Sequence, residues 1–147
     1  MAVTNPLVMD LGAAQSFLAA PHIGLLAVAR RSGPPVASPV WYGYEPGGDV
    51  VFTIGRNSAK AKALRTAGVA SLCAQNEQLP YAFVTVDGPV VVGDTTADEA
   101  LRAQIALRYL GEEFAPGYIE STKGSDNVLA RLTPEHWRSN DYSRVSP

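Results

Sequence analysis

Cysteine is nearly absent from this sequence, and Cys73 is its one representative. A single thiol can form neither an intrachain disulfide nor a cysteine-based zinc site, and such sparse usage is typical of a reducing compartment. The two histidines, His22 and His136, lie far apart in the sequence and form no metal-ligand motif. We therefore expect no metal site and predict a cytoplasmic protein.

Long apolar runs are also missing. No stretch approaches the ~20 residues that a membrane-spanning helix needs. The first residues, MAVTNPLVMDLG, lack the basic region and the long apolar core of a signal peptide. Neither a membrane span nor a signal peptide is predicted.

The common catalytic signatures are absent as well. The chain has no G-x-S-x-G elbow, no H-E-x-x-H, no P-loop and no G-x-G-x-x-G. Neither histidine has neighbours that mark a triad, and Cys73 lies in an apolar run, where we interpret it as a buried small hydrophobe. No side chain is predicted to be catalytic, so any redox chemistry would belong to a bound cofactor.

Charge is moderate in amount and nearly balanced in sign. Of the 147 residues, 18% are charged and 46% are hydrophobic, and the formal net charge is -2. This composition is typical of a soluble globular protein with one sizeable core, so residues 1–147 are predicted to form a single domain. A negative net charge argues against a protein that binds nucleic acid mainly through phosphate contacts.

The sequence does contain a succession of short apolar segments between turn residues. Helices are predicted at residues 10–20, 58–67 and 98–110, the last with Thr96 and Glu99 as a capping box. Strands are predicted at residues 23–29, 35–45, 50–54, 69–74, 81–86, 89–92 and 128–132. The remaining segments are interpreted as a break at Asp87-Gly88, a helical turn at 118–122 and a polar tail at 133–147.

Antiparallel hairpins dominate this order, and the helices are few. Pro39 cannot donate to a ladder, which predicts an edge, a bulge or an interruption in the strand 35–45. The predicted fold class is mainly β, a small barrel with helices at its mouth.

The start of the second predicted helix is rich in cations. Those cations are Arg56, Lys60, Lys62 and Arg65, with no acid among them. Asn57 or Ser58 can cap the helix, whose first turn presents free N–H groups and a positive dipole end. This combination predicts a seat for a phosphate or another anion. The alternative is a solvated basic face of an amphipathic helix.

Aromatic residues gather on two predicted strands. Trp41, Tyr42 and Tyr44 lie on one, and Tyr81 and Phe83 lie on another. Most will be core or interface residues, but one ring could form the wall of a site for a flat conjugated ligand. A ligand with a planar ring and a phosphate would suit both this wall and the basic helix start, which points to a nucleotide-like redox cofactor.

A series of short motifs supports this hypothesis. They are Gly33-Pro34-Pro35, Ser38-Pro39-Val40-Trp41-Tyr42, Val51-Phe52-Thr53, Ser58-x-Lys60-x-x-x-Leu64, Val69-Ala70-Ser71-Leu72, and Pro80-Tyr81 followed by Val84-x-Val86-x-Gly88. In this order and spacing the chain resembles the pyridoxamine-5′-phosphate-oxidase-like split β-barrel family, and it looks closest to the actinobacterial branch of flavin/deazaflavin oxidoreductases.

The resemblance implies an antiparallel split β-barrel of six to seven strands with peripheral helices. It also implies a homodimer with two cofactor sites at the subunit interface, and FMN or coenzyme F420 as the cofactor. The implied activity is hydride transfer between that cofactor and a small organic substrate. A cofactor with an acidic tail such as F420 would use further cations, for which Arg30, Arg31, Arg56, Lys62 and Arg65 are candidates.

The family pattern also implies roles for individual residues. The residues expected to face the ring and its ribityl chain are Ser38, Pro39, Val40, Trp41, Thr53 and Ile54. Ser58 and Lys60 would hold the phosphate, with Arg56 and Lys62 as helpers. The partner subunit would contribute the region from Gln78 to Tyr81, and Trp137.

Two other functions remain open at this point. A non-catalytic flavin- or F420-binding carrier would have the same sequence features, because the chemistry lies in the cofactor. A haem-binding split barrel would need an axial ligand, for which the sequence offers His22 or His136.

Overall fold

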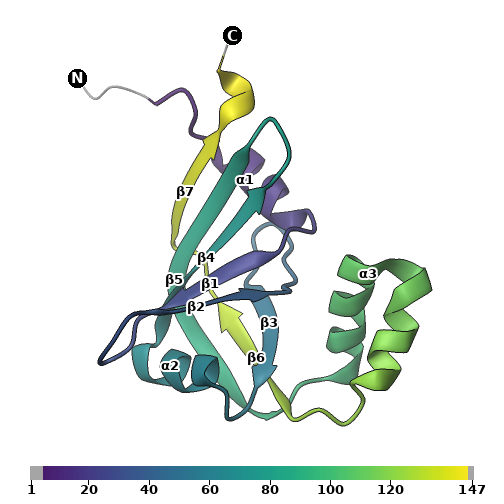
Figure 1. The fold of residues 1–147 in the computed structure, drawn as a ribbon. Helices are drawn as coiled ribbons and strands as arrows, with labels where there is room; N and C mark the ends of the chain where they lie inside the picture. The colour runs from purple at the N-terminus through teal and green to yellow at the C-terminus, as the bar shows by residue number, and fades with distance from the viewer. Residues whose placement is uncertain (1–4, 146–147) are drawn as a thin grey trace.

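The computed structural model describes residues 5–145, which form an antiparallel sheet that curls into a split barrel with three helices around it (Figure 1). The helices are α1 (Leu11–Ala19), α2 (Ala59–Ala67) and α3 (Glu99–Ser121), followed near the end by the 3-10 turn Tyr142–Arg144. The strands are β1 (Gly24–Val28), β2 (Val36–Val40), β3 (Val50–Gly55), β4 (Val69–Asn76), β5 (Ala82–Thr96), β6 (Asn127–Leu132) and β7 (His136–Asp141). None of the helices in this part of the chain has the length and apolar character needed to cross a membrane.

The long strand β5 joins the two halves of the barrel. Its first half pairs with β4 on one side and with β7 on the other, and its second half pairs with β6. The strand order is β2-β1-β4-β5-β6-β3, and a bridge between Gly43 and Val51 connects the chain after β2 to β3. All of these pairings are antiparallel, which confirms the predicted mainly β split barrel.

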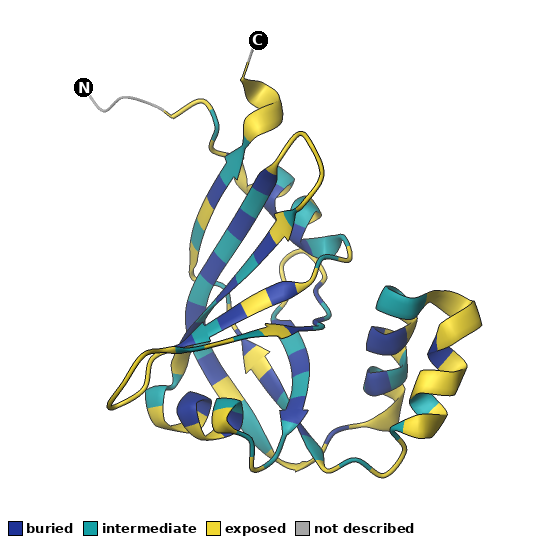
Figure 2. Cartoon of the chain, viewed as in Figure 1, coloured by how far each residue is buried: buried dark blue, intermediate teal, exposed yellow. Residues whose placement is uncertain are grey.

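The core fills the inside of this curled sheet. Alternate residues of β3 and of most of β5 are buried, which gives these strands a banded pattern (Figure 2). Phe52, Leu72, Val84 and Leu132 are among the side chains without exposed surface. The period of two places one face of these strands in the core, as side-chain alternation requires.

The second helix begins and ends as predicted. Ser58 is its N-cap, and Gly68 follows its last turn with φ 69, in the left-handed region that glycine enters without strain. Pro39 also lies where the ladder tolerates it, because β2 pairs with β1 and ends the strand order of the described chain.

The predicted break at Asp87-Gly88 is wrong, because β5 runs through it without interruption. The chain that joins β6 to β7 crosses β5 at this point. The amide of Thr133 donates to the carbonyl of Pro89 at 3.0 Å, and the amide of Glu135 donates to the carbonyl of Asp87 at 2.9 Å. Gly88 does not form a turn. Its lack of a side chain allows the two backbones to approach closely.

The predicted polar tail is also wrong within the described residues, since His136–Asp141 forms β7. The segment pairs with β5 over six residues, from Asp87 opposite His136 to Ala82 opposite Asp141. Its one buried side chain is Ser139, whose hydroxyl accepts from the amide of Met9 at 3.0 Å. A strand that contributes a polar side chain to the interior lacks the apolar alternation by which strands are found. Residues 146–147 lie outside the described residues.

The third helix differs from its prediction at both ends. Asp98, and not Thr96, is the N-cap, and its carboxylate accepts from the amide of Ala100 at 3.0 Å. The helical chain continues to Ser121 after a kink at Gly111, which has φ 75 and ψ 174. The predicted helical turn at 118–122 is thus the end of a second helical segment that folds back beside the first (Figure 1).

Candidate functional site

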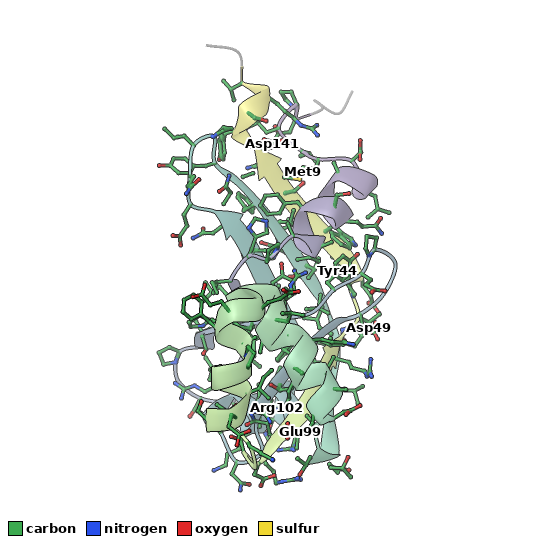
Figure 3. The ribbon with its side chains drawn as sticks, turned by 90° about the vertical axis from the view of Figure 1, so that its right-hand side faces the viewer. Met9, Tyr44, Asp49, Glu99, Arg102 and Asp141 are labelled. Atoms are coloured by element: carbon green, nitrogen blue, oxygen red, sulfur yellow. The ribbon has the colours of Figure 1, made fainter. Side chains whose placement is uncertain are left out.

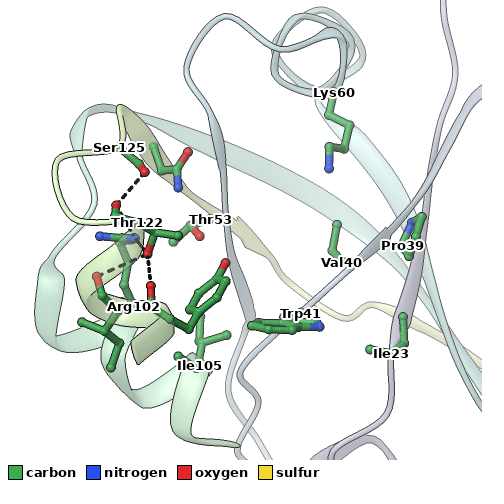
Figure 4. A pocket seen from close by; sticks show the side chains of 14 residues that line it. Ile23, Pro39, Val40, Trp41, Thr53, Lys60, Arg102, Ile105, Thr122 and Ser125 are labelled. Carbon is green, nitrogen blue, oxygen red and sulfur yellow. Dashed lines mark hydrogen bonds between the residues drawn. The ribbon is translucent and has the colours of Figure 1, made fainter. Parts of the chain in front are cut away.

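A cleft of about 530 Å³ lies between the barrel and α3 (Figure 4). Its lining residues are Ile23, Pro39, Val40, Trp41, Thr53, Lys60, Arg102, Ile105, Ala106, Tyr118, Ile119, Thr122, Ser125 and Asn127. They include two cations, Lys60 and Arg102, and no carboxylate. The volume falls in the range of about 300–1,000 Å³ that small-molecule sites occupy, and the charge favours an anionic ligand.

Lys60 supplies the accessible positive charge of the cleft. It is the second residue of α2, and its side chain extends into the cleft (Figure 4). No ion pair among residues 5–145 includes it. Its ammonium lies at the positive end of the helix dipole, beside amides of the first turn that have no intrahelical acceptor. Lysine and helix start together form the kind of seat that phosphate groups occupy.

The Ser58 hydroxyl is engaged within its own helix start. It accepts from the amide of Ala61 at 3.1 Å and donates to the carbonyl of Gly55 at 2.8 Å. Ser58 does not line the cleft. Ser58 therefore caps the first turn of α2, the turn that contains Lys60.

Arg56 does not line the cleft either, although it was predicted to help hold the phosphate. Its Nε lies 3.0 Å from both carboxylate oxygens of Asp126, and its Nη1 donates to the carbonyl of Asp94. Asp94 precedes α3 and Asp126 follows it. Arg56 therefore ties the two ends of the α3 segment together, through a partner that lies 70 residues away in the sequence.

Lys62 lies on the exposed side of α2 and is not among the cleft residues. Two residues along a helix correspond to a rotation of about 200°, so Lys60 and Lys62 project from opposite sides. Of the four cations at the predicted helix start, the structure brings only Lys60 into the cleft.

The predicted ring-facing residues divide into two groups. Pro39, Val40, Trp41 and Thr53 line the cleft. Ile54 is 3% exposed and belongs to the core, because its neighbour Thr53 occupies the outward position of β3. Ser38 does not line the cleft, and its hydroxyl donates to the Pro39 carbonyl at 3.4 Å.

The residues predicted to act from the partner subunit do not line the cleft of their own chain. Gln78 lines a separate cavity of about 460 Å³, together with Cys73, which is half-buried and not buried as predicted. Tyr81 is exposed and precedes β5. Trp137 packs within its own chain, with its ring 6.3 Å from that of Tyr44.

The wall provided by α3 was not predicted. Arg102 is 9% exposed, and its Nη1 lies 2.8 Å from a carboxylate oxygen of Glu99, with both residues at one end of α3 (Figure 3). Its Nη2 donates to the Thr122 hydroxyl at 2.8 Å, which joins the first turn of α3 to its end. The Glu99–Arg102 spacing of three residues was the available signal for this pair.

One side of the cleft is aromatic. The Trp41 ring stacks on Tyr109 with 5.3 Å between the ring centroids and an interplanar angle of 10°. Tyr118 from the second segment of α3 lies 5.2 Å from the same ring. Trp41 and Tyr118 both line the cleft, so a flat conjugated ligand would find aromatic surface there.

The fold and the cleft together define a split barrel whose cleft is lined by Lys60 and Arg102 and by no carboxylate. The family model of pyridoxamine 5'-phosphate oxidase matches residues 11–141, and the chain belongs to this family. No curated protein matches the chain in sequence.

Solved structures with the same fold agree with this assignment. A conserved hypothetical protein, Rv2991 from Mycobacterium tuberculosis, superposes with a TM-score of 0.76 at 20% identity, covering 98% of this chain and 92% of that one. An F420 reductase gives a TM-score of 0.67 at 23% identity, with 84% and 94% coverage. A FAD-binding protein from Mesorhizobium loti gives 0.65 at 17% identity, with 90% and 93% coverage. These structures share the fold of the chain, and the family model shows the family to which it belongs.

Proposed function

We propose that the protein binds FMN or coenzyme F420 in the cleft and transfers hydride between the bound cofactor and a small organic substrate. The observation that carries this proposal is the Lys60 ammonium. It extends into a cleft without acidic lining residues, at a helix start, next to the apolar and aromatic end of β2. A phosphate-bearing planar cofactor matches these features in charge and shape.

The roles of the chain are binding, orientation and exclusion of water. The bound cofactor supplies the hydride chemistry. Lys60 and the first-turn amides of α2 would hold its phosphate, and Pro39, Val40 and Trp41 would contact its ring. The side chains of α3 would cover the cleft from the other side and restrict the access of water.

The proposal includes both FMN and F420. Cations along an acidic tail would favour F420, and the candidates were Arg30, Arg31, Arg56, Lys62 and Arg65. None of these residues lines the cleft. Arg30 donates to the Pro34 carbonyl at 2.7 Å, and Arg65 donates to the Arg56 carbonyl at 2.9 Å. The structural likeness to an F420 reductase supports F420 to the extent of the shared fold.

The test is the absorption spectrum of the purified protein during titration with each cofactor. We expect saturable binding of FMN or F420, followed by oxidation of the reduced cofactor that depends on an added acceptor. Absence of binding to both cofactors would contradict the proposal. Binding without acceptor-dependent oxidation would instead identify the second candidate, a cofactor carrier on the same barrel. A haem-binding barrel has less support, because neither His22 nor His136 lines the cleft.

A homodimer is the second part of the proposal. The outer face of the sheet has an apolar patch around Leu25, which is 48% exposed and lies opposite Pro39 on β2 and Cys73 on β4. Ile23 and Pro39 line both the cleft and the cavity that contains Gln78. A second copy on this face would bury the apolar patch and reach the edge of the cleft.

Leu25→Glu is expected to shift the protein from dimer to monomer in sedimentation velocity, since a buried unpaired carboxylate opposes association. Val91→Glu is the matched control, because Val91 is 69% exposed on β5 and lies outside this face. Wild-type protein that sediments as a monomer at micromolar concentration would refute the dimer. That result would not bear on the proposed binding of a cofactor.

A further inference from the structure

We infer that Arg108 is the positioning residue of the cleft: its guanidinium fastens α3 to the C-terminal end of α1 and thereby sets where the α3 wall of the cleft stands. The identity of the ligand in this inference rests on the proposed function. The role of Arg108 in the position of α3 does not depend on it.

The end of α1 offers carbonyl acceptors to such a partner, and Arg108 is the donor found for the Ala19 carbonyl among the described residues. The last carbonyls of a helix have no intrahelical donor, and they form the negative end of the helix dipole. The last turn of α1 contains no basic residue, and Pro21, which follows the cap Ala20, has no N–H to offer.

Arg108 reaches this end from α3. Its Nη1 donates to the carbonyl of Ala19 at 2.6 Å, and its Nη2 donates to the carbonyl of Ala20 at 2.8 Å, with the Leu18 carbonyl 3.4 Å away. The guanidinium carbon also lies 5.1 Å from the centroid of the Tyr42 ring. A planar fork that meets several carbonyls and an aromatic face is specific to arginine.

Tyr109 also attaches α3 to the barrel. Arg108 and Tyr109 together are called the clasp. The Tyr109 hydroxyl donates to the carbonyl of His22 at 2.7 Å and accepts from the amide of Tyr42 at 3.2 Å. Its ring is the one that stacks on Trp41. The clasp therefore connects α3 directly to an aromatic residue that lines the cleft.

Two titratable side chains, Tyr42 and His22, lie beside the clasp. Burial, and after it the Tyr109 hydroxyl, raises the pKa of Tyr42, which stays protonated and donates to the Leu18 carbonyl at 2.7 Å. Burial, and after it the positive charge of Arg108, lowers the pKa of His22. Both neighbours are thus neutral near pH 7 and leave Arg108 as the cation of the clasp.

Packing on the other flank of α3 is incomplete. A second cavity of about 380 Å³ lies there, lined by Gln104, Ile105 and Arg108 of α3 and by Tyr44 of the barrel. Ile105 lines this cavity and the cleft as well. The Nε of Arg108 and the hydroxyl of Tyr44 have no acceptor among the described residues. Ile105 is buried where α3 meets the barrel, with a cavity on either side of it, so polar attachments contribute to the position of α3.

The polar contacts of α3 lie at two places along the helix. Arg56 fastens the end of α3 that is nearest the sheet through Asp126, and Arg102 joins the two ends of α3 to each other through Thr122. Arg108 and Tyr109 fasten the helix two turns further on. Loss of the clasp should therefore leave α3 joined to the barrel but free to move away from Trp41.

The experiment compares Arg108→Met with Arg30→Met, which removes the same charge from the hairpin between β1 and β2. Both are made in a Trp137→Phe background, so that Trp41 is the one tryptophan. In Arg108→Met we expect amides of α3 to exchange at least tenfold faster, those of α2 to be unchanged, and acrylamide quenching of Trp41 to rise at least twofold. Arg30→Met should change none of these.

Tyr109→Phe provides a second variant that keeps the ring stack and removes the hydroxyl. It should shift α3 exchange in the same direction by a smaller factor. Unchanged exchange and quenching in Arg108→Met, or equal acceleration in α2 and α3, would overturn the inference, the latter because it indicates global destabilisation. None of these readouts needs a cofactor. If wild-type protein binds FMN or F420, Arg108→Met should also raise its Kd about tenfold, whereas absence of wild-type binding bears on the proposed function alone.

Discussion

Lys60→Ala is expected to raise the Kd for FMN or F420 by about 10- to 100-fold. The variant removes a charge-assisted hydrogen bond to the phosphate, which contributes roughly 1.5–3 kcal/mol, and each 1.4 kcal/mol corresponds to about tenfold in affinity. The fold should be unaffected, because Lys60 makes no ion pair with the rest of the described chain. Titration monitored by cofactor absorbance gives the Kd, and thermal unfolding gives the stability.

Lys62→Ala is the matched control for this prediction. It removes the same charge from the same helix, but from the exposed side that faces away from the cleft. Its Kd should stay within about twofold of wild type, because solvent screens a distant exposed charge. Equal losses in the two variants would indicate that the basic helix attracts the cofactor only through its overall charge, and the seat at Lys60 would be disproved.

Ser58→Ala separates the helix start from the lysine. The hydroxyl caps α2 and bonds Gly55, so its removal should cost about 1 kcal/mol of unfolding free energy. Any loss of affinity in this variant should be smaller than that of Lys60→Ala and should accompany the loss of stability. A Ser58→Ala protein of wild-type stability with strongly reduced affinity would show that the hydroxyl contacts the ligand directly.

The sequence predicted features that depend on neighbours along the chain. The cap at Ser58 and the turn at Gly68 involve contacts within one helix, and the strands are marked by local apolar patterns. The direction of Lys60 into the cleft follows from the same local geometry. These features were accessible because helix ends and strand alternation are encoded within a few residues.

Features that depend on distant partners were missed. Arg56 resembled a phosphate ligand in its local sequence, but Asp126 engages it from 70 residues away. The first segment of α3 was predicted as a helix, but the second was interpreted as a single turn because Gly111 interrupts the helical pattern. For β7, the polar composition concealed a strand whose inward residue, Ser139, bonds a backbone amide and not an apolar core.

Gly88→Ala is expected to destabilise the protein by about 3 kcal/mol, the upper part of the range for an overpacked site. A Cβ at Gly88 would overlap the carbonyl oxygen of Thr133. The crossing chain cannot move away easily, since the amides of Thr133 and Glu135 donate to the carbonyls of Pro89 and Asp87 on either side of Gly88. A methyl group here must break at least one of these bonds or displace the segment that joins β6 to β7.

The expected decrease in Tm is roughly 10 °C, given about 2–4 °C per kcal/mol for a domain of this size. Gly117→Ala is the matched control, because Gly117 lies in the second segment of α3, has no positive φ, and has no neighbouring atom within 4 Å of the point where an alanine Cβ would lie. That change should be neutral or stabilising by up to about 1 kcal/mol, since alanine favours helix over glycine. If Gly88→Ala melts like wild type, the crossing between β5 and residues 133–135 is looser than its hydrogen bonds indicate. If its Tm falls as expected, the crossing of residues 133–135 over β5 requires a residue without a side chain at position 88. A glycine in mid-strand here marks a close approach between two backbones and not the end of the strand.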